Sequence, residues 1–174
     1  MLKYIIDLIV KFILWLLSFL FMIMIAKSEY VITRDTANKV VISGKINWED
    51  WQKHAEWQDY KADEYKINTA FSDSILQIMK LNKITFMLFA GSWCSDSKEQ
   101  MPKLYKVLSY CNYPINNIEL YGVDRKKEES SGIAKALQIL NVPTLIIIKN
   151  NNEIGRIVET PSHSWEEDIF NFIK

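Results

Sequence analysis

The sequence predicts an α/β fold in which a central mixed β-sheet is flanked by helices, and two observations carry this prediction. Along residues 72–140, short apolar runs of strand length alternate with stretches whose apolar residues recur at helical spacing. Two further strand-like runs, separated by asparagines, follow at residues 145–159. The first pattern is typical of parallel strands joined by helices, and the second of an antiparallel hairpin at the edge of the sheet.

The first 28 residues differ from the rest of the chain. Lys3 and Lys11 precede or border an apolar run at 12–26 that is interrupted only by Ser18, and small residues suited to cleavage follow at Ala26-Lys27-Ser28. We therefore expect residues 1–28 to be a signal peptide that exports the protein to the periplasm or cell envelope. The alternative is an uncleaved membrane anchor, because the apolar run approaches the roughly 20 residues of a bilayer span. The membrane would then be contacted only through residues 1–26.

Composition excludes several classes of function. The 174 residues carry 21 basic and 21 acidic side chains, so no strongly basic surface for nucleic acid is expected. Two cysteines are too few for a disulfide-stapled scaffold. His54 and His163 are far apart in sequence and no Cys/His cluster has metal-ligand spacing, so we expect neither a metal nor another cofactor.

Residues 29–70 form an aromatic-rich N-terminal extension for which we expect some helix. A β-prone run at 39–46 leads to Asn47, which can cap a helix whose first turn is acidic. Five aromatic residues follow: Trp48, Trp51, Trp57, Tyr60 and Tyr65. They could form a ligand-binding wall, but aromatic residues at helical spacing more often supply core area, so we expect them to pack the extension onto the next domain.

In the domain that follows, residues 71–174, a first helix is expected to precede the order β-α-β-α, which is then followed by β-β-α. The expected elements are a helix capped by Ser72 or Asp73 and running to about Leu81, a buried strand at 84–90, a helix at 93–110, a strand at 118–123, a helix at about 131–140, strands at 145–149 and 153–159, and a last helix capped by Ser164 and Glu167.

Cys94 opens the predicted helix at 93–110 and is the candidate nucleophile. Free backbone N–H groups and the positive end of the helix dipole favour a thiolate there. Ser97, one turn further on, can donate a hydrogen bond to the same sulfur, and Lys98 adds a positive charge. Asp96 acts against the thiolate as a nearby anion, although it also stabilises the helix start.

Several spacings carry a resemblance to a known family. Trp93-Cys94 directly follows a buried strand, Pro102 lies eight residues after the cysteine, and Val142-Pro143-Thr144 precedes the terminal hairpin and helix. Residues 71–174 thus resemble the thioredoxin superfamily. The resemblance implies a cis Val142–Pro143 peptide and a substrate groove formed by Trp93, Asp96, Val142 and Pro143. More narrowly, the W-C-x-D-S pattern of residues 93–97 is similar to exported bacterial thioredoxin-like proteins that have a single motif cysteine.

Two departures from the family pattern affect function. The family's second motif cysteine is replaced by Ser97, and a buried acid found in thioredoxins six residues before the first cysteine is Leu88 here. Cys111 cannot substitute for the missing thiol, because a helix between it and Cys94 separates the two by about 25 Å, far beyond disulfide reach. We interpret Cys111 as a buried small hydrophobe.

Two functions remain open at this stage. The first is thiol–disulfide exchange with protein or small-molecule thiols and disulfides, in which Cys94 and Ser97 act at the reacting sulfur and an external thiol resolves the mixed disulfide. The second is a redox-inactive module that binds peptides or proteins in the thioredoxin groove.

Overall fold

The computed structural model describes residues 11, 29–58, 60 and 62–174. The signal peptide or anchor predicted for residues 1–28 therefore lies outside the described residues, of which only Lys11 falls in that segment. In the described part of the chain, no helix combines the length and apolarity needed to cross a bilayer.

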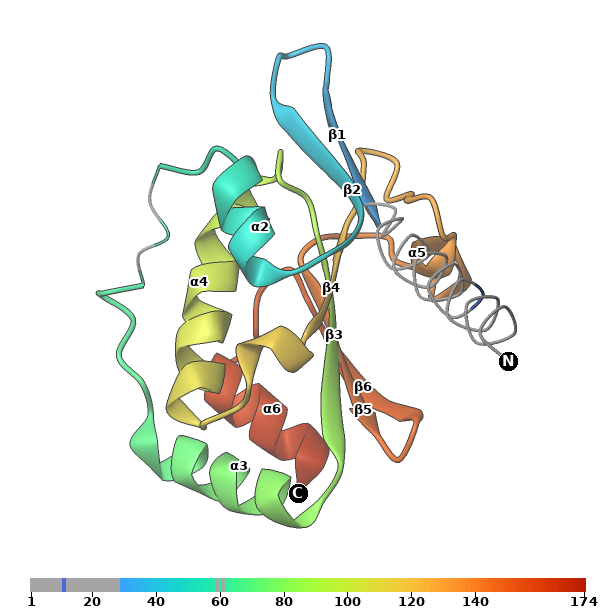
Figure 1. The fold of residues 1–174 in the computed structure, drawn as a ribbon. Coiled ribbons are helices and arrows are strands. Elements are labelled where there is room, and N and C mark those ends of the chain that lie inside the picture. Colours follow the sequence, from blue (N-terminus) through green and yellow to red (C-terminus); the bar gives the residue numbers. More distant parts are fainter. Residues whose placement is uncertain (1–10, 12–28, 59, 61) are drawn as a thin grey trace, which may run out of the picture.

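Six strands form one mixed sheet in the order β1-β2-β4-β3-β5-β6 (Figure 1). Only β3 and β4 pair in parallel, while the other neighbours pair antiparallel. The predicted mixed α/β sheet is confirmed. The strands are β1 (Tyr30–Arg34), β2 (Val40–Ile46), β3 (Ile84–Ala90), β4 (Glu119–Gly122), β5 (Thr144–Lys149) and β6 (Asn152–Val158).

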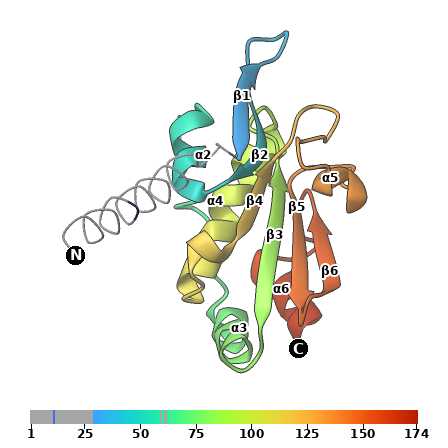
Figure 2. The same cartoon turned by 45° about the vertical axis from the view of Figure 1, so that its right-hand side comes forward.

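Helices cover both faces of this sheet unequally. The α-helices are α2 (Trp48–His54), α3 (Thr69–Leu81), α4 (Ser95–Tyr110), α5 (Ile133–Ala136) and α6 (Trp165–Ile173), and a 3-10 helix η1 (Ile115–Asn117) precedes β4. Residues of α2, α3, α4 and α6 share the larger core cluster with one face of the sheet. The short α5 packs on the opposite face with a smaller cluster (Figures 1 and 2). The site described below lies where the two layers meet at the start of α4.

The N-terminal extension contributes two strands to the sheet as well as the predicted helix. The sequence did not predict β1. Four of its five residues are exposed, so it lacks the apolar pattern of a buried strand, and its place in the sheet depends on pairing with β2. Gly44 in β2 has a φ of 118°, and a Cβ there would lie 2.2 Å from the Glu29 carbonyl oxygen, so only glycine permits this hairpin. The predicted cap of α2 is confirmed, since the Asn47 side chain accepts a hydrogen bond from the Asp50 amide at 2.8 Å.

The aromatic residues of the extension pack it onto the rest of the molecule, as expected. Trp51 is fully buried, and its ring meets that of Trp57 edge to face at 5.4 Å. Trp48 stacks on Tyr105 of α4, with ring centroids 3.8 Å apart. Large aromatic areas buried in this way stabilise the contact between the extension and α4.

Two helix predictions were wrong. α3 begins at Thr69, so Ser72 and Asp73 lie inside it and do not cap it. A long-range contact fixes this start, because the buried Glu166 carboxylate accepts a hydrogen bond from the Asn68 amide at 3.0 Å. The helix expected at about 131–140 is reduced to the single turn of α5, since Gln138 adopts a left-handed φ of 54° that ends it.

The C-terminal elements agree closely with prediction. β3 spans Ile84–Ala90 as expected, and β5 and β6 form a hairpin whose turn residues Asn150 and Asn151 have positive φ. The side chain of Ser164 caps α6 by accepting a hydrogen bond from the Glu167 amide at 3.1 Å.

Candidate functional site

Cys94 lies at the N-terminal end of α4, in the capping position and not in the first helical turn. Its φ and ψ of −92° and 129° are extended, and its carbonyl accepts the first helical hydrogen bond, from the Lys98 amide at 3.1 Å. The side chain is half-buried. The side chain forms no capping hydrogen bond with the N–H groups of the first turn, so the sequence correctly placed Cys94 at the helix start, but the structure shows no bond from those groups to the sulfur.

The Val142–Pro143 turn lies directly against this sulfur. The peptide bond between the two residues is cis. Both residues are buried, and the Cys94 thiol donates a hydrogen bond to the Val142 carbonyl over an Sγ–O distance of 3.4 Å. Thr144 starts β5 immediately afterwards and pairs with Phe89 of β3, so the turn is held by the centre of the sheet. The structure thus places Val142 and Pro143, which the family resemblance assigned to the substrate groove, directly against Cys94.

Trp93 forms a partly buried cover beside Cys94. Its indole N–H donates a hydrogen bond to the Val123 carbonyl at 2.9 Å, and its ring packs on the smaller core cluster. The Arg125 guanidinium lies 4.8 Å from the ring centroid and the Lys127 ammonium 5.9 Å, both within cation–π range. A Cβ on Gly91 would lie 2.8 Å from the ring, so glycine is needed for the indole to fold back.

Ser97 is bonded differently from the prediction. It is fully buried, and its hydroxyl oxygen accepts a hydrogen bond from the Gly91 amide at 3.2 Å. The hydrogen bond of the Cys94 sulfur goes to Val142, so Ser97 supports the loop before the cysteine. Asp96 is exposed and has no hydrogen-bond partner among the residues that the structure describes. It stands next to the site without contacting its other members.

A pocket of 340 Å³ lies beside Cys94, and the N-terminal extension forms one of its walls. The opposite wall consists of the loop around Cys94 and the first turn of α4, including Lys98. From the extension come Asn38, Lys39, Val40, Ala55, Glu56 and Trp57. The sequence analysis named a ligand-binding wall of aromatic residues as the less favoured alternative, and of those residues Trp57 alone lines this pocket. The other five lining residues of the extension were not anticipated, because nothing in them resembles the motif of the site.

Direct hydrogen bonds fasten the extension to the loop before Cys94. The Ser92 hydroxyl donates to the Val40 carbonyl at 2.7 Å and accepts from the Ile42 amide at 3.0 Å. The Trp57 indole N–H donates to the Ser92 carbonyl at 2.7 Å. Ser92 and Trp57 are buried, so these bonds are shielded from water. The wall of the pocket is therefore fixed relative to the cysteine.

Cys111 lies at the other end of α4 and is 1% exposed. Its thiol donates a hydrogen bond to the Ser72 carbonyl over 3.5 Å. Burial raises the pKa of this thiol to about 11. Both cysteines are free, and the 16 residues of α4 between them span about 24 Å. The interpretation of Cys111 as a buried small residue is confirmed.

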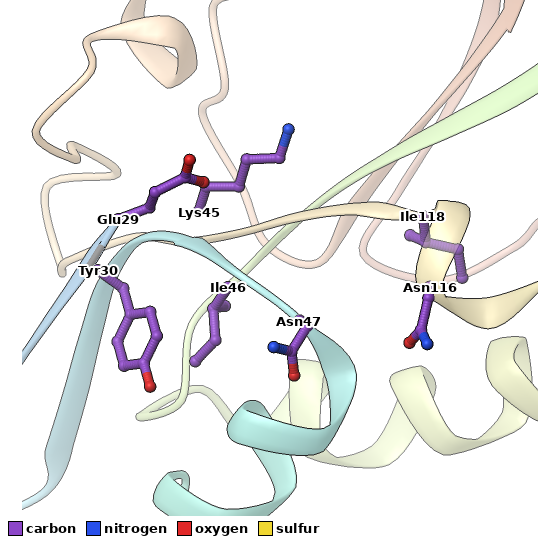
Figure 3. Close-up of a pocket in the computed structure, with 7 residues that line it drawn as sticks. All are labelled: Glu29, Tyr30, Lys45, Ile46, Asn47, Asn116 and Ile118. Atoms are coloured by element: carbon purple, nitrogen blue, oxygen red, sulfur yellow. The ribbon is translucent and has the colours of Figure 1, made fainter. Parts of the chain in front are cut away.

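Another pocket lies away from this site. A second pocket, of 280 Å³, is found at the opposite end of β2, between the start of α2 and η1 (Figure 3). Its charged side chains are Glu29 and Lys45, and no cysteine or histidine lines it. Within the described residues, no group of three or more His, Cys, Asp or Glu side chains could hold a metal ion.

A thiol at the start of a helix, facing a cis-proline turn of a mixed sheet, defines this chain as a protein with the thioredoxin-like fold. Residues 64–174 match the family model for thioredoxin, and the chain belongs to the thioredoxin family. Residues 29–63, which include the extension's wall of the pocket, precede that match.

Two curated relatives are thioredoxins. Thioredoxin H2 of Arabidopsis thaliana is 23% identical over 93 residues, which cover 53% of this chain and 65% of that protein. A thioredoxin of Echinococcus granulosus is 28% identical over 86 residues, or 49% of this chain and 75% of that protein. The chain thus spans just under two thirds of the first of these relatives.

Solved structures with a similar fold have low overall similarity. Thioredoxin O2 from Arabidopsis thaliana, in its oxidised state, aligns with a TM-score of 0.41 and 19% identity over 61% of this chain and 89% of that one. A protein of unknown function from Pseudomonas aeruginosa aligns with a TM-score of 0.47 and 16% identity over 64% of this chain and 76% of that one.

Proposed function

We propose that this protein carries out thiol–disulfide exchange through Cys94 alone, with an external thiol completing each cycle. The observation that supports the proposal is the position of the Cys94 sulfur, which is half-exposed, at a helix N-terminus and against the Val142 carbonyl. An accessible thiol of this kind reacts with disulfides through its thiolate form. The other cysteine, Cys111, is buried at the far end of α4 and takes no part.

The reaction needs two exchange steps. In the first, the Cys94 thiolate attacks one sulfur of a substrate disulfide; a bond forms between them as the substrate S–S bond breaks, and the released thiolate takes a proton from water. In the second, an external thiolate attacks the mixed disulfide and restores Cys94. Because Ser97 cannot act as a leaving or attacking thiol, the adduct persists until that external thiol arrives.

The Val142 carbonyl has a further part in this cycle. In the free protein it accepts the hydrogen bond of the Cys94 thiol. A sulfur bonded to substrate has no proton to donate, so the carbonyl then becomes available to a backbone N–H of a bound peptide. Pro143 has no N–H of its own and is buried beside it. Formation of the mixed disulfide thus coincides with a new place for substrate to bind.

Intact-mass spectrometry of the full chain tests the proposal. After incubation with 2-hydroxyethyl disulfide, we expect one mercaptoethanol adduct per chain, which glutathione removes. The variant Cys94→Ser should form no adduct, and Cys111→Ser should behave as the unaltered protein does. The protein should also accelerate reduction of a peptide disulfide by glutathione. Binding of the peptide without acceleration and without an adduct would favour the alternative, a redox-inactive module that uses the same groove.

We also propose that the protein works in the cell envelope, as expected of the exported single-cysteine proteins that the W-C-x-D-S pattern resembles. The supporting feature is the charged and then apolar segment at residues 1–28. N-terminal sequencing of the protein from a fractionated bacterial expression host tests this. A new N-terminus near Glu29 in the periplasm indicates a cleaved signal peptide, and an intact chain in the membrane fraction indicates an anchor. An intact chain in the cytoplasm contradicts the proposal.

A further inference from the structure

The pocket beside Cys94 is built in part by residues that the family match does not include. All of its lining residues from the extension lie between Asn38 and Trp57, before the match begins at residue 64. The buried side chains of Val40, Ala55 and Trp57 supply apolar contact area. A volume of 340 Å³ accommodates a short substituent on a sulfur that is bonded to Cys94.

The charges in this pocket are unbalanced. Lys39 and Lys98 line it from opposite walls, both are exposed, and neither forms an ion pair with any residue that the structure describes. The one carboxylate in the lining is Glu56, and Arg34 already binds both of its oxygens. The exposed Asp96 does not line the pocket. Two ammonium groups are therefore left to interact with a ligand.

The backbone that carries Lys39 is fixed relative to the sulfur. Its amide donates to an Asp35 carboxylate oxygen at 2.9 Å, and its carbonyl accepts from the Asp35 amide at 3.0 Å. Asp35 in turn forms an ion pair with Arg125, which covers Trp93. On the other side, Ser92 binds the backbone of the adjacent Val40. The backbone from which the lysine side chain extends is thus in place before any substrate arrives.

We propose that this pocket selects disulfides whose substituent carries a carboxylate, with Lys39 and Lys98 as the specificity-determining residues. The inference rests on the proposed exchange through Cys94 and names its substrate class. The carboxylate lies between the two ammonium groups while the carbon chain contacts Val40 and Trp57. In the exchange, the Cys94–sulfur bond forms, the substrate disulfide bond breaks, and the leaving thiolate is protonated by water. A second thiol then releases the bound half.

Three disulfides of similar size test this selection on the full chain with the Cys111→Ser substitution. They are 3,3′-dithiodipropionate, 2-hydroxyethyl disulfide and cystamine, which are anionic, neutral and cationic. We expect the rate of adduct formation to fall in that order, with about 10-fold between the anionic and cationic reagents at low salt. High salt should reduce the difference, because the lysines are exposed.

The ratio of anionic to neutral rates identifies the lysines responsible. In the double variant that carries both Lys39→Gln and Lys98→Gln, the ratio of anionic to neutral rates should fall to about 1. The control Lys103→Gln makes the same change on α4, where the lysine pairs with Glu99 and lies outside the pocket, and should leave the ratio unchanged. The ratio matters more than the absolute rate, since Lys98 lies in the first turn after Cys94 and its substitution changes the charge near the site for every reagent. An equal rate for all three reagents overturns the inference and leaves the exchange intact, whereas no adduct with any reagent overturns the exchange.

The same carboxylate could belong to a small molecule or to an acidic segment of a protein. Two cysteine-containing peptides distinguish these sources. In one the cysteine is flanked by glutamates and in the other by lysines, and each peptide is supplied as a mixed disulfide with mercaptoethanol. Faster reaction of the acidic peptide than of dithiodipropionate indicates a protein substrate. Preference for dithiodipropionate over both peptides indicates a small molecule. A preference for the lysine-flanked peptide overturns the inference.

Discussion

The two ends of α4 carry the same residue type in opposite surroundings. Cys94, at the start, is half-buried beside a pocket and faces the Val142 carbonyl. Cys111, at the end, is 1% exposed and belongs to the larger core cluster. The position along one helix therefore separates a candidate nucleophile from a structural thiol. The chemistry of each sulfur follows from burial and neighbouring groups, since the residues themselves are identical.

The two ends also differ in how their polar groups are paired. Around Cys94 the charged groups are exposed, as in Lys98 and Asp96. Near Cys111, the fully buried Glu166 accepts hydrogen bonds from the Tyr65 hydroxyl at 2.6 Å and the Asn68 amide at 3.0 Å. This difference predicts that substitutions at the Cys94 end change reactivity, whereas those at the Cys111 end change stability.

The largest expected effect is on alkylation by iodoacetamide. At pH 8 and under native conditions we expect Cys94 to react at least about 100-fold faster than Cys111, because a buried thiol with a raised pKa must wait for local opening. Peptide mapping by mass spectrometry after timed quenching measures both rates in one sample. In denaturant the two rates should become equal. Comparable native rates would show that Cys111 is accessible and would remove the contrast.

Glu166→Ala should produce the largest loss of stability among the changes considered. It removes a fully buried carboxylate and leaves the partly buried Tyr65 hydroxyl and the Asn68 amide without their acceptor, which costs about 2–3 kcal/mol. Glu166→Gln keeps one acceptor and should cost less. Asp96→Ala, at the exposed end, should stay within about 0.5 kcal/mol. Urea unfolding measures all three, and equal losses for Glu166→Ala and Asp96→Ala would contradict the comparison.

Local patterns were enough to predict elements both near Cys94 and at the far end of the sheet. The apolar run at 84–90, the asparagine turn and the Ser164 cap depend on neighbouring residues, and each was confirmed. The same applies to the separation of the two cysteines, which follows from helix geometry alone. The cis peptide at Val142–Pro143 and its place against Cys94 were expected only through the family resemblance.

Long-range contacts explain what the sequence did not reveal. The start of α3 is fixed by Glu166, which lies 98 residues from Asn68 in the sequence. The wall of the Cys94 pocket depends on Ser92 reaching Val40, 52 residues away. Ser97 was expected to bind the sulfur, but the Gly91 amide is its partner in the folded loop. Such pairings become visible only when the strands are placed side by side.

At the Cys111 end, we expect stability to fall at alkaline pH. Because burial raises the pKa of this thiol from 9.0 to about 11, the unfolded chain loses its proton first as pH rises. The contribution of Cys111 to stability is therefore complete below pH 9 and is lost between pH 9 and 11, by about 3 kcal/mol at about 1.4 kcal/mol per unit of pKa. Urea unfolding at several pH values should show a shallower decline in Cys111→Ser.

Two tyrosines also affect stability at high pH, half-buried Tyr60 and buried Tyr121, and their contribution must be separated from that of Cys111. Burial also raises the pKa of Tyr60 and Tyr121 to about 12, so both proteins lose stability at high pH. Only the difference between them reports on Cys111. An identical slope in the two proteins would mean that the thiol does not titrate differently on unfolding.

The smallest expected effect concerns the ion pair between Asp35 and Arg125 at the Cys94 end. Asp35→Asn removes the charge but keeps an oxygen that can accept from the Ala37 and Lys39 amides. The hairpin turn should therefore persist while Arg125 is held less firmly over Trp93. We expect a slight fall in the urea midpoint and a change in tryptophan fluorescence that Trp93→Phe abolishes.

Acid should reproduce this change in the unaltered protein. Hydrogen bonds from the Lys39 backbone, followed by the Arg125 side chain, lower the pKa of Asp35 below its ordinary value of 3.8. Stability from this carboxylate is thus present above pH 3.8 and is lost as pH falls through the lower pKa of the folded state. The fluorescence of the unaltered protein should then approach that of Asp35→Asn. If the two remain different at acid pH while both stay folded, the ion pair is not what positions Arg125 over the indole ring.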